Sequence, residues 1–188
     1  MSIRVDSLCH VYHPGTPLET QALSGVDLIV ERGTWVAVVG QTGSGKSTLA
    51  QHLNALLLPS SGRVEVDEVP TTAGALAVRE IRRKVGLVFQ YPEHQLFAET
   101  VREEMAFGPR NWEFPEEEIK NSTRKAMDLL GLPQELLDRS PFELSGGQKR
   151  RLSIASVLVS RPDYLVLDEP TAGLDAQGRK ELLYLLKR

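Results

Sequence analysis

The sequence lacks most of the features of a secreted or membrane-spanning protein. Its 188 residues contain a single cysteine, Cys9, which excludes an internal disulfide framework and suits a reducing cytosol. No stretch approaches the ~20 apolar residues that a membrane-spanning helix needs, and the N-terminus has no apolar core of signal-peptide length. We therefore expect Cys9 to be a small, half-buried apolar side chain, and any link to a membrane to run through a partner protein.

An excess of positive charge is also missing. The formal net charge is −3, so no basic field attracts the chain to nucleic acid. We interpret the short basic cluster at residues 149–151 as a solvated helix face. Apolar residues make up 41% of the chain, which at this length predicts one soluble domain with a sizeable core.

What the sequence does contain is a series of apolar strands and amphipathic helices. The run Trp35–Val39 is continuously apolar, which predicts a buried strand that ends at a glycine-rich loop. From Tyr91 to Arg139 the pattern changes to helix and loop, so we expect a parallel α/β core interrupted by a helical insertion. Other strands are predicted at 26–30, 63–66, 85–89 and 164–167, and helices at 46–58, 100–107, 116–130, 146–160 and from 175 onward. Thr100 is the predicted N-cap of the helix at 100–107, with Glu103 as its capping-box partner.

The loop after this strand fits the phosphate-loop spacing G-x-x-x-x-G-K-[ST]. Its glycines let the backbone wrap a phosphate, and the helix that follows adds the positive end of its dipole. Lys46 is expected to reach the β- and γ-phosphates of a nucleotide, and the Ser47 hydroxyl to ligate Mg²⁺. A chance match is the alternative, but the predicted strand before the loop and the helix after it argue against one. The candidate phosphate-binding residues are Gly40, Gln41, Thr42, Gly43, Ser44, Gly45, Lys46, Ser47 and Thr48.

A second motif lies at the end of the predicted strand 164–167. There the apolar run delivers two consecutive carboxylates, Asp168 and Glu169. In a phosphate-loop fold Asp168 is placed to hold Mg²⁺, and Glu169 is placed to polarise an attacking water. The alternative is an acidic strand end that only starts a turn, which Pro170 would also suit.

With these motifs, the run Leu144–Gln148 (Leu-Ser-Gly-Gly-Gln) and the segment Ala172–Asp175 make the sequence resemble the nucleotide-binding domain of ATP-binding-cassette (ABC) ATPases. The resemblance covers nearly the whole chain. It implies an α/β fold of the phosphate-loop NTPase class: a mainly parallel core sheet, an N-terminal antiparallel β part and a helical insertion. It also implies a single domain over 1–188, with the β part and ATP core at about 1–90 and 161–188 and the helical subdomain at about 91–160.

The resemblance assigns roles to residues outside the two motifs. Gln90 matches the glutamine that senses the γ-phosphate and Mg²⁺, so the implied metal ligands are Ser47, Gln90 and Asp168. Tyr12 sits where an aromatic ring commonly stacks on the adenine of ATP. Glu169 is the implied catalytic base. The alternative for Gln90 is an ordinary polar residue at a strand end.

In this family the signature run of one subunit completes the nucleotide site of another. Ser145 and Gly147 match positions that contact the γ-phosphate of ATP held by the partner, and Gly146 and Gln148 belong to the same run. Asp175 matches the aspartate of the loop that follows the catalytic carboxylate. The alternatives are structural, because Ser145 and Asp175 are also good helix N-caps.

A narrower resemblance is carried by the segments Val11–Glu19, Gln51–Pro59 and Gln90–Phe97. They look like the ATPase subunits of energy-coupling-factor transporters, which import vitamins or cobalt and nickel ions, and are closest to the second of the paired ATPases. This implies a peripheral subunit on the cytoplasmic face of the cell membrane that uses ATP and Mg²⁺. The implied partners are a second ATPase (in a homo- or heterodimer), a transmembrane coupling protein and a substrate-binding membrane subunit, with no nucleic acid.

Four alternatives stay open at this point. They are the ATPase of another ABC importer, a soluble ABC ATPase that acts on DNA or ribosomes, a small-molecule kinase with a phosphate loop, and a non-catalytic fragment. The family also places a switch histidine beyond the helix expected from residue 175. The histidines of this sequence, His10, His13, His52 and His94, all lie before the signature. We therefore expect the chain to be C-terminally incomplete, and weakly active or inactive on its own.

Overall fold

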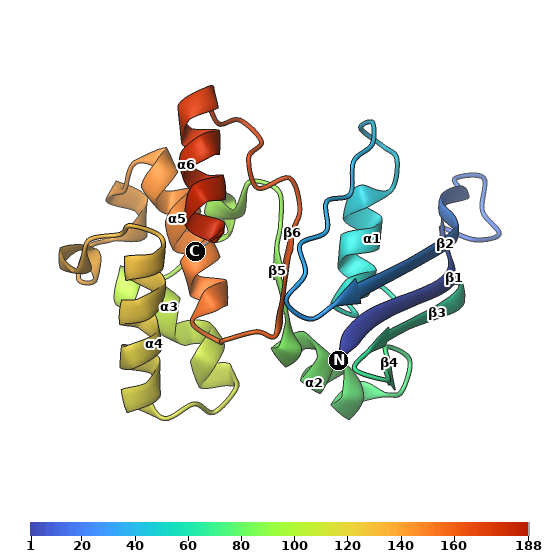
Figure 1. Cartoon of the computed structure of the whole chain (residues 1–188), viewed down its shortest axis with the longest axis horizontal. Helices are drawn as coiled ribbons and strands as arrows, with labels where there is room; N and C mark the ends of the chain where they lie inside the picture. Colours follow the sequence, from blue (N-terminus) through green and yellow to red (C-terminus); the bar gives the residue numbers. More distant parts are fainter. Residues whose placement is uncertain (188) are drawn as a thin grey trace. The chain divides into compact units, whose positions relative to one another are not determined.

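A computed structural model describes residues 1–187 (Figure 1). The chain forms two compact units, each of which is described by itself. Unit 1 comprises Met1–Leu87 and Asp163–Asp168, and unit 2 comprises Val88–Pro162 and the residues from Glu169 onward. Over the described residues, no helix combines the length and the apolar character that crossing a membrane requires.

Unit 1 is built on an antiparallel sheet of four strands in the order β2-β1-β3-β4. Along β1, Ile3, Val5 and Leu8 are buried and their neighbours are more exposed, as expected for a strand with one face on the core. The predicted N-terminal antiparallel part is confirmed. The strands are β1 (Ser2–Tyr12), β2 (Thr20–Glu31), β3 (Ser61–Val66) and β4 (Val69–Pro70).

Helix α1 (Lys46–Leu53) packs its buried side chains, including Leu49 and Leu53, into the same core. The helix ends at Leu53, whereas the sequence pattern predicted that it would continue to residue 58, just before Pro59. The reason lies at Ala55, whose φ of 56° is left-handed, and at Asn54, whose side-chain amide donates to the carbonyl of Val85 at 3.0 Å. These two features turn the chain out of the helix.

Unit 1 also contains a helix that the sequence pattern did not reveal, α2 (Ala75–Lys84). Ile81 is the only buried residue of this helix. The helix leads into β5 (Val85–Val88), which pairs with β6 (Tyr164–Leu167) in a parallel two-stranded sheet. Both strands lie where the sequence predicted them.

The predicted strand at Trp35–Val39 is wrong. Residues 35–39 adopt no strand conformation, and all five side chains are exposed, with Val39 at 93%. A strand forms only when its backbone N–H and C=O groups pair with a neighbour, and no described strand pairs with this run. Apolar composition alone was therefore not sufficient to predict a strand at residues 35–39.

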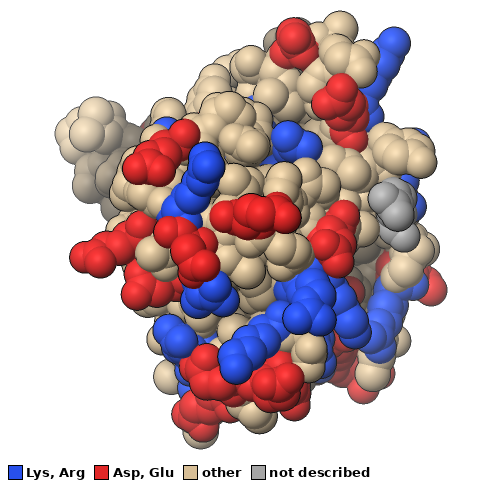
Figure 2. Space-filling model, turned by 90° about the vertical axis from the view of Figure 1, so that its left-hand side faces the viewer, with Lys and Arg blue, Asp and Glu red and all other residues tan. Residues whose placement is uncertain are grey.

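Unit 2 is helical. Its helices are α3 (Val101–Asn111), α4 (Glu116–Leu129), α5 (Gly146–Leu158) and α6 (Ala176–Leu186), with short 3₁₀ turns η1 (Pro92–Gln95), η2 (Gln134–Leu136) and η3 (Pro141–Glu143). Thr100 caps α3 by accepting a hydrogen bond from the Glu103 N–H, as predicted, although the helix runs on to Asn111. α3, α4 and α5 pack together, and Met105, Met127 and Leu152 are fully buried. On the face shown in Figure 2, acidic and basic side chains are interspersed.

Candidate functional site

The phosphate loop lies in unit 1, between residue 39 and the start of α1 (Figure 1). The Lys46 ammonium donates to the carbonyls of Gly40 and Gln41, each at 3.0 Å, so its positive charge is held at the loop. α1 begins directly after Gly45, which has no side chain to cap the first turn. The N-terminal end of the helix dipole therefore points into the loop, as a phosphate requires.

Gly45 is the glycine of this loop that the structure constrains most. Its φ of 88° is left-handed, and an added Cβ would lie 2.6 Å from the carbonyl oxygen of Ala22 and 2.8 Å from Leu23 Cδ2. Gly43 has a similar φ of 82°, but a Cβ there meets no atom within 4 Å. The backbone at Gly45 is thus pressed against β2, which explains why no other residue type fits this position.

Tyr12 lies at the end of β1 and is connected to the phosphate loop. Its hydroxyl is 3.2 Å from Thr48 Oγ1 in the first turn of α1, and its ring packs edge-on against His10 at 4.5 Å between centroids. His10 also packs edge-on against His52, whose Nδ1 is 2.8 Å from the Thr48 carbonyl oxygen. This cluster fixes the Tyr12 ring close to the start of α1.

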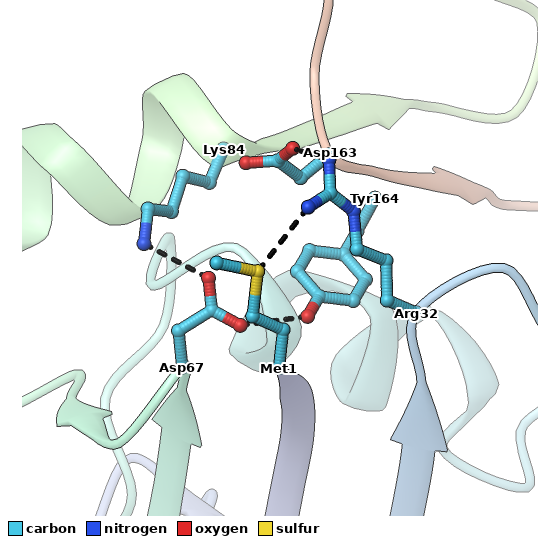
Figure 3. A network of polar contacts seen from close by, with 6 residues as sticks. All are labelled: Met1, Arg32, Asp67, Lys84, Asp163 and Tyr164. Atoms are coloured by element: carbon cyan, nitrogen blue, oxygen red, sulfur yellow. Dashed lines mark hydrogen bonds and ion pairs between the residues drawn. The ribbon is translucent and has the colours of Figure 1, made fainter.

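Asp168 directly follows β6 and is buried, with 8% of its surface exposed. The start of the same strand is held by a polar network, shown in Figure 3. There the Tyr164 hydroxyl donates to Asp67 at 2.7 Å, and Lys84 donates to the other oxygen of Asp67 at 2.8 Å. The network fixes the N-terminal end of the strand that carries Asp168.

In unit 2 the structure brings Gln90 and Glu169 together, although they are 79 positions apart in the sequence. The Gln90 side-chain amide donates to Glu169 Oε2 at 3.1 Å. Glu169 has a left-handed φ of 46°, and Tyr91, next to Gln90, has a φ of 53°. Such backbone costs about 1–3 kcal/mol for a residue with a side chain and is concentrated at functional sites.

The signature run starts α5 with a capping box. Ser145 Oγ accepts from the Gln148 N–H at 3.3 Å, and Gln148 Oε1 accepts from the Ser145 N–H at 3.0 Å. Ser145, Gly146 and Gly147 are exposed. Asp175 caps α6 by accepting from the Gly178 N–H at 2.7 Å. The structural alternatives considered for Ser145 and Asp175 are therefore present, and their roles toward a nucleotide stay predictions.

The interpretation of residues 149–151 as a solvated face is wrong for Arg150, which is 3% exposed. Its guanidinium forms two hydrogen bonds with Glu93 and two with backbone carbonyls beyond Glu169. The sequence held a signal for this. Arg150 precedes the buried Ser153 and Ile154 by three and four residues, which places it on the buried face of α5.

The sequence and the fold are similar to those of known proteins. The family model described as ABC transporter matches residues 23–172, a span that includes the phosphate loop, the signature run and both carboxylates. The chain belongs to this ABC transporter family. An ABC cassette of this kind is an α/β ATP-binding fold, and the fold class expected from the sequence is confirmed.

Two curated relatives are named energy-coupling factor transporter ATP-binding protein EcfA2. The one from Clostridium tetani is 53% identical over 188 residues, which is all of this chain and 65% of the relative. The one from Streptococcus sanguinis is 50% identical over 189 aligned residues, again all of this chain and 68% of the relative. The chain thus spans about two thirds of the length of these relatives.

Solved structures of ABC transporter proteins are also similar to this chain. CbiO1 from Clostridium perfringens, described as part of the ABC transporter complex cbiONQ, matches with a TM-score of 0.86 and 41% identity over 98% of this chain and 71% of that one. The dimeric bacterial ABC transporter cassette MJ0796 matches with a TM-score of 0.85 and 29% identity, over 98% of this chain and 81% of that one. A further MJ0796 structure is a post-hydrolysis state bound to ADP and Pi.

Proposed function

We propose that this ABC chain is the ATP-binding and ATP-hydrolysing part of an energy-coupling-factor importer subunit. The observation that carries the proposal is identity of about half of all residues, along the entire chain, to proteins named as the second ATP-binding subunit of such transporters. The proposed partners are a second ATPase and membrane proteins. The proposed location is the cytoplasmic face of the membrane, and the substrate would be selected by a membrane partner.

The residue roles follow the chemistry of their positions. In unit 1 the phosphate loop and Lys46 would bind the ATP phosphates, and Tyr12 would support the adenine. In unit 2 Glu169 would polarise the attacking water, and Gln90 would respond to the γ-phosphate. Ser145, Gly147 and Asp175 would act toward the partner subunit.

Mg²⁺ is the proposed metal. The Ser47 hydroxyl and the Asp168 carboxylate are hard oxygen donors, the kind that Mg²⁺ prefers, and Mg²⁺ takes most of its other ligands from phosphates and water. The described residues contain no group of three or more His, Cys, Asp or Glu side chains that would make a self-contained metal site. That donor set suits a metal that arrives with its nucleotide, and its chemistry is to neutralise phosphate charge.

The test is Glu169→Gln in the protein expressed from the complete coding sequence and reconstituted with its membrane partners. The variant keeps the side-chain size but removes the carboxylate. We expect ATP binding within about twofold of wild type and a loss of turnover of at least about a hundredfold. Turnover near the wild-type rate would refute the role of Glu169, and a wild-type complex that neither hydrolyses ATP nor imports a substrate would refute the proposed function.

A further inference from the structure

Arg150 donates four side-chain hydrogen bonds within unit 2. Its side chain is 4% exposed, and its two outer branches face different segments of the chain. Nε and one terminal nitrogen donate to the two oxygens of Glu93, at 3.1 and 2.9 Å. The other terminal nitrogen donates to the carbonyls of Pro170 and Ala172, at 3.4 and 2.5 Å. A planar guanidinium has the fixed fork that makes such a double attachment possible.

Both segments that Arg150 holds carry a residue of the proposed chemistry. Glu93 lies in η1, three residues after Gln90, and Pro170 immediately follows Glu169. The same guanidinium lies 6.0 Å from the centre of the Tyr91 ring. A Cβ added to Gly173 would meet that ring at 3.7 Å, so the two segments also adjoin each other beside Arg150.

The environment of the Arg150–Glu93 ion pair favours its stability. Burial of the Glu93 carboxyl opposes its ionisation, but the hydrogen bonding and charge of Arg150, together with a backbone hydrogen bond and the charge of His94, outweigh this effect and hold its pKa below the ordinary value. Removing one partner of a buried pair leaves the other charge without compensation, which costs far more than the loss of an exposed pair. Arg150 is therefore committed to this position rather than sampling solvent.

We propose that Arg150 is a positioning residue, which clamps the segments that carry Gln90 and Glu169 so that their 3.1 Å contact is maintained. Arg150 belongs to α5, so the clamp also connects both segments to the helix that the signature run begins. The inference rests on the proposed ATPase function and adds to it a residue outside the known motifs. No step of the chemistry passes through Arg150 itself.

The test compares Arg150→Lys with a matched variant elsewhere in unit 2. Lysine keeps the charge but has no planar fork, so it cannot hold a carboxylate and two carbonyls together. Arg110 offers the control, because it also forms a two-bond pair with a glutamate, Glu116, but both side chains are more than half exposed. Glu93→Gln is a milder second variant that keeps the shape of the side chain, in case Arg150→Lys folds poorly.

Two measurements are made on each variant in the reconstituted complex expressed from the complete coding sequence. For Arg150→Lys and Glu93→Gln we expect kcat for ATP hydrolysis to fall at least about tenfold, with KM for ATP changed less than about threefold. We also expect hydrogen–deuterium exchange to rise together in peptides covering 90–96 and 169–174. For Arg110→Lys both readouts stay at wild-type values.

Unchanged exchange in both peptides overturns the clamp, whatever the ATPase rate. Faster exchange with an unchanged kcat overturns the positioning role while leaving the clamp as a structural feature. A kcat that falls only in proportion to the folded fraction, measured by thermal unfolding, overturns it as well. An inactive wild-type complex instead refutes the proposed function, which distinguishes that failure from a failure of the inference.

Discussion

Two apolar runs in unit 1 lead into the two nucleotide motifs, and only one of them is a strand. Tyr164–Leu167 forms β6, pairs with β5 and delivers Asp168, whereas residues 35–39 precede the phosphate loop without pairing to any described strand. The side chains of the two runs are of the same kind. The difference shows that backbone pairing and anchored ends, rather than hydrophobicity, decide which run becomes a strand.

The largest effect is expected for Val166→Asp. Val166 is partly buried and packs against the core cluster of unit 1, so a carboxylate there would lose part of its hydration. We expect the free energy of unfolding of the 188-residue chain to fall by about 2–4 kcal/mol, measured by urea denaturation. A loss below about 1 kcal/mol would show that β6 is no better covered than residues 35–39.

Removal of the anchor of β6 should have the next largest effect. In Tyr164→Phe the hydroxyl that donates to Asp67 is lost, while Lys84 still pairs with that carboxylate. We expect a loss of about 1–2 kcal/mol in the same denaturation experiment, as for a hydrogen bond to a charged acceptor. Tyr184→Phe is the control, because Tyr184 is 69% exposed and should have no effect. An equal change in the free energy of unfolding for both variants would show that the hydrogen bond to Asp67 does not stabilise β6.

The two motif regions should also respond to pH in different ranges. Near the phosphate loop, burial of the His52 imidazole lowers its pKa below 6.5, so the unfolded chain binds a proton more readily than the folded one. Stability from this group is complete above pH 6.5 and is lost as the pH falls below that value. We expect Tm to decrease by a few degrees as the pH falls below 6.5. In the variant His52→Gln this decrease in Tm should be smaller.

Near β6 the corresponding group is Asp67. Burial opposes its ionisation, but the hydrogen bonds from Lys84 and Tyr164 prevail and lower its pKa below 3.8. Its contribution is therefore present above pH 3.8 and is lost as the pH falls through the lowered folded-state value. Asp67→Asn should lower Tm by a constant amount above pH 3.8, and this difference from wild type should disappear as the pH falls through the acid range. A difference that already disappears near pH 6 would contradict this assignment.

The smallest effect is expected for Val38→Asp, the counterpart of Val166→Asp in the other run. Val38 is 51% exposed, so a carboxylate there stays in water. We expect a change within about 0.5 kcal/mol in the 188-residue chain. A loss as large as that of Val166→Asp would show that residues 35–39 are covered in solution.

The sequence predicted the elements whose stabilisation is local. Thr100 was predicted as a cap, and capping was the structural alternative for Ser145 and Asp175; all three do cap their helices. Both β5 and β6 lie where the apolar runs placed them. Two predictions that were wrong concern residues whose structure depends on partners far away along the chain. The run 35–39 needs a strand to pair with, and the burial of Arg150 depends on Glu93, which is 57 positions away. The helical periodicity places Arg150 on the buried face of α5, but no local pattern reports which distant residue it pairs with.

The proposed site shows the same division. Lys46 and Asp168 are recognisable from spacing, because a phosphate loop and a strand-end carboxylate are continuous motifs. The contact of Gln90 with Glu169 and the left-handed backbone at Glu169 appear only once the chain is folded.

The capping box at the start of α5 has one further consequence. A serine hydroxyl has two acceptor lone pairs and one hydrogen, and the box uses Ser145 Oγ only as an acceptor. The hydrogen is not consumed by the cap, and a hydroxyl that already accepts a bond becomes a better donor. Capping the helix and donating a hydrogen bond to an anion are thus compatible tasks for one exposed side chain.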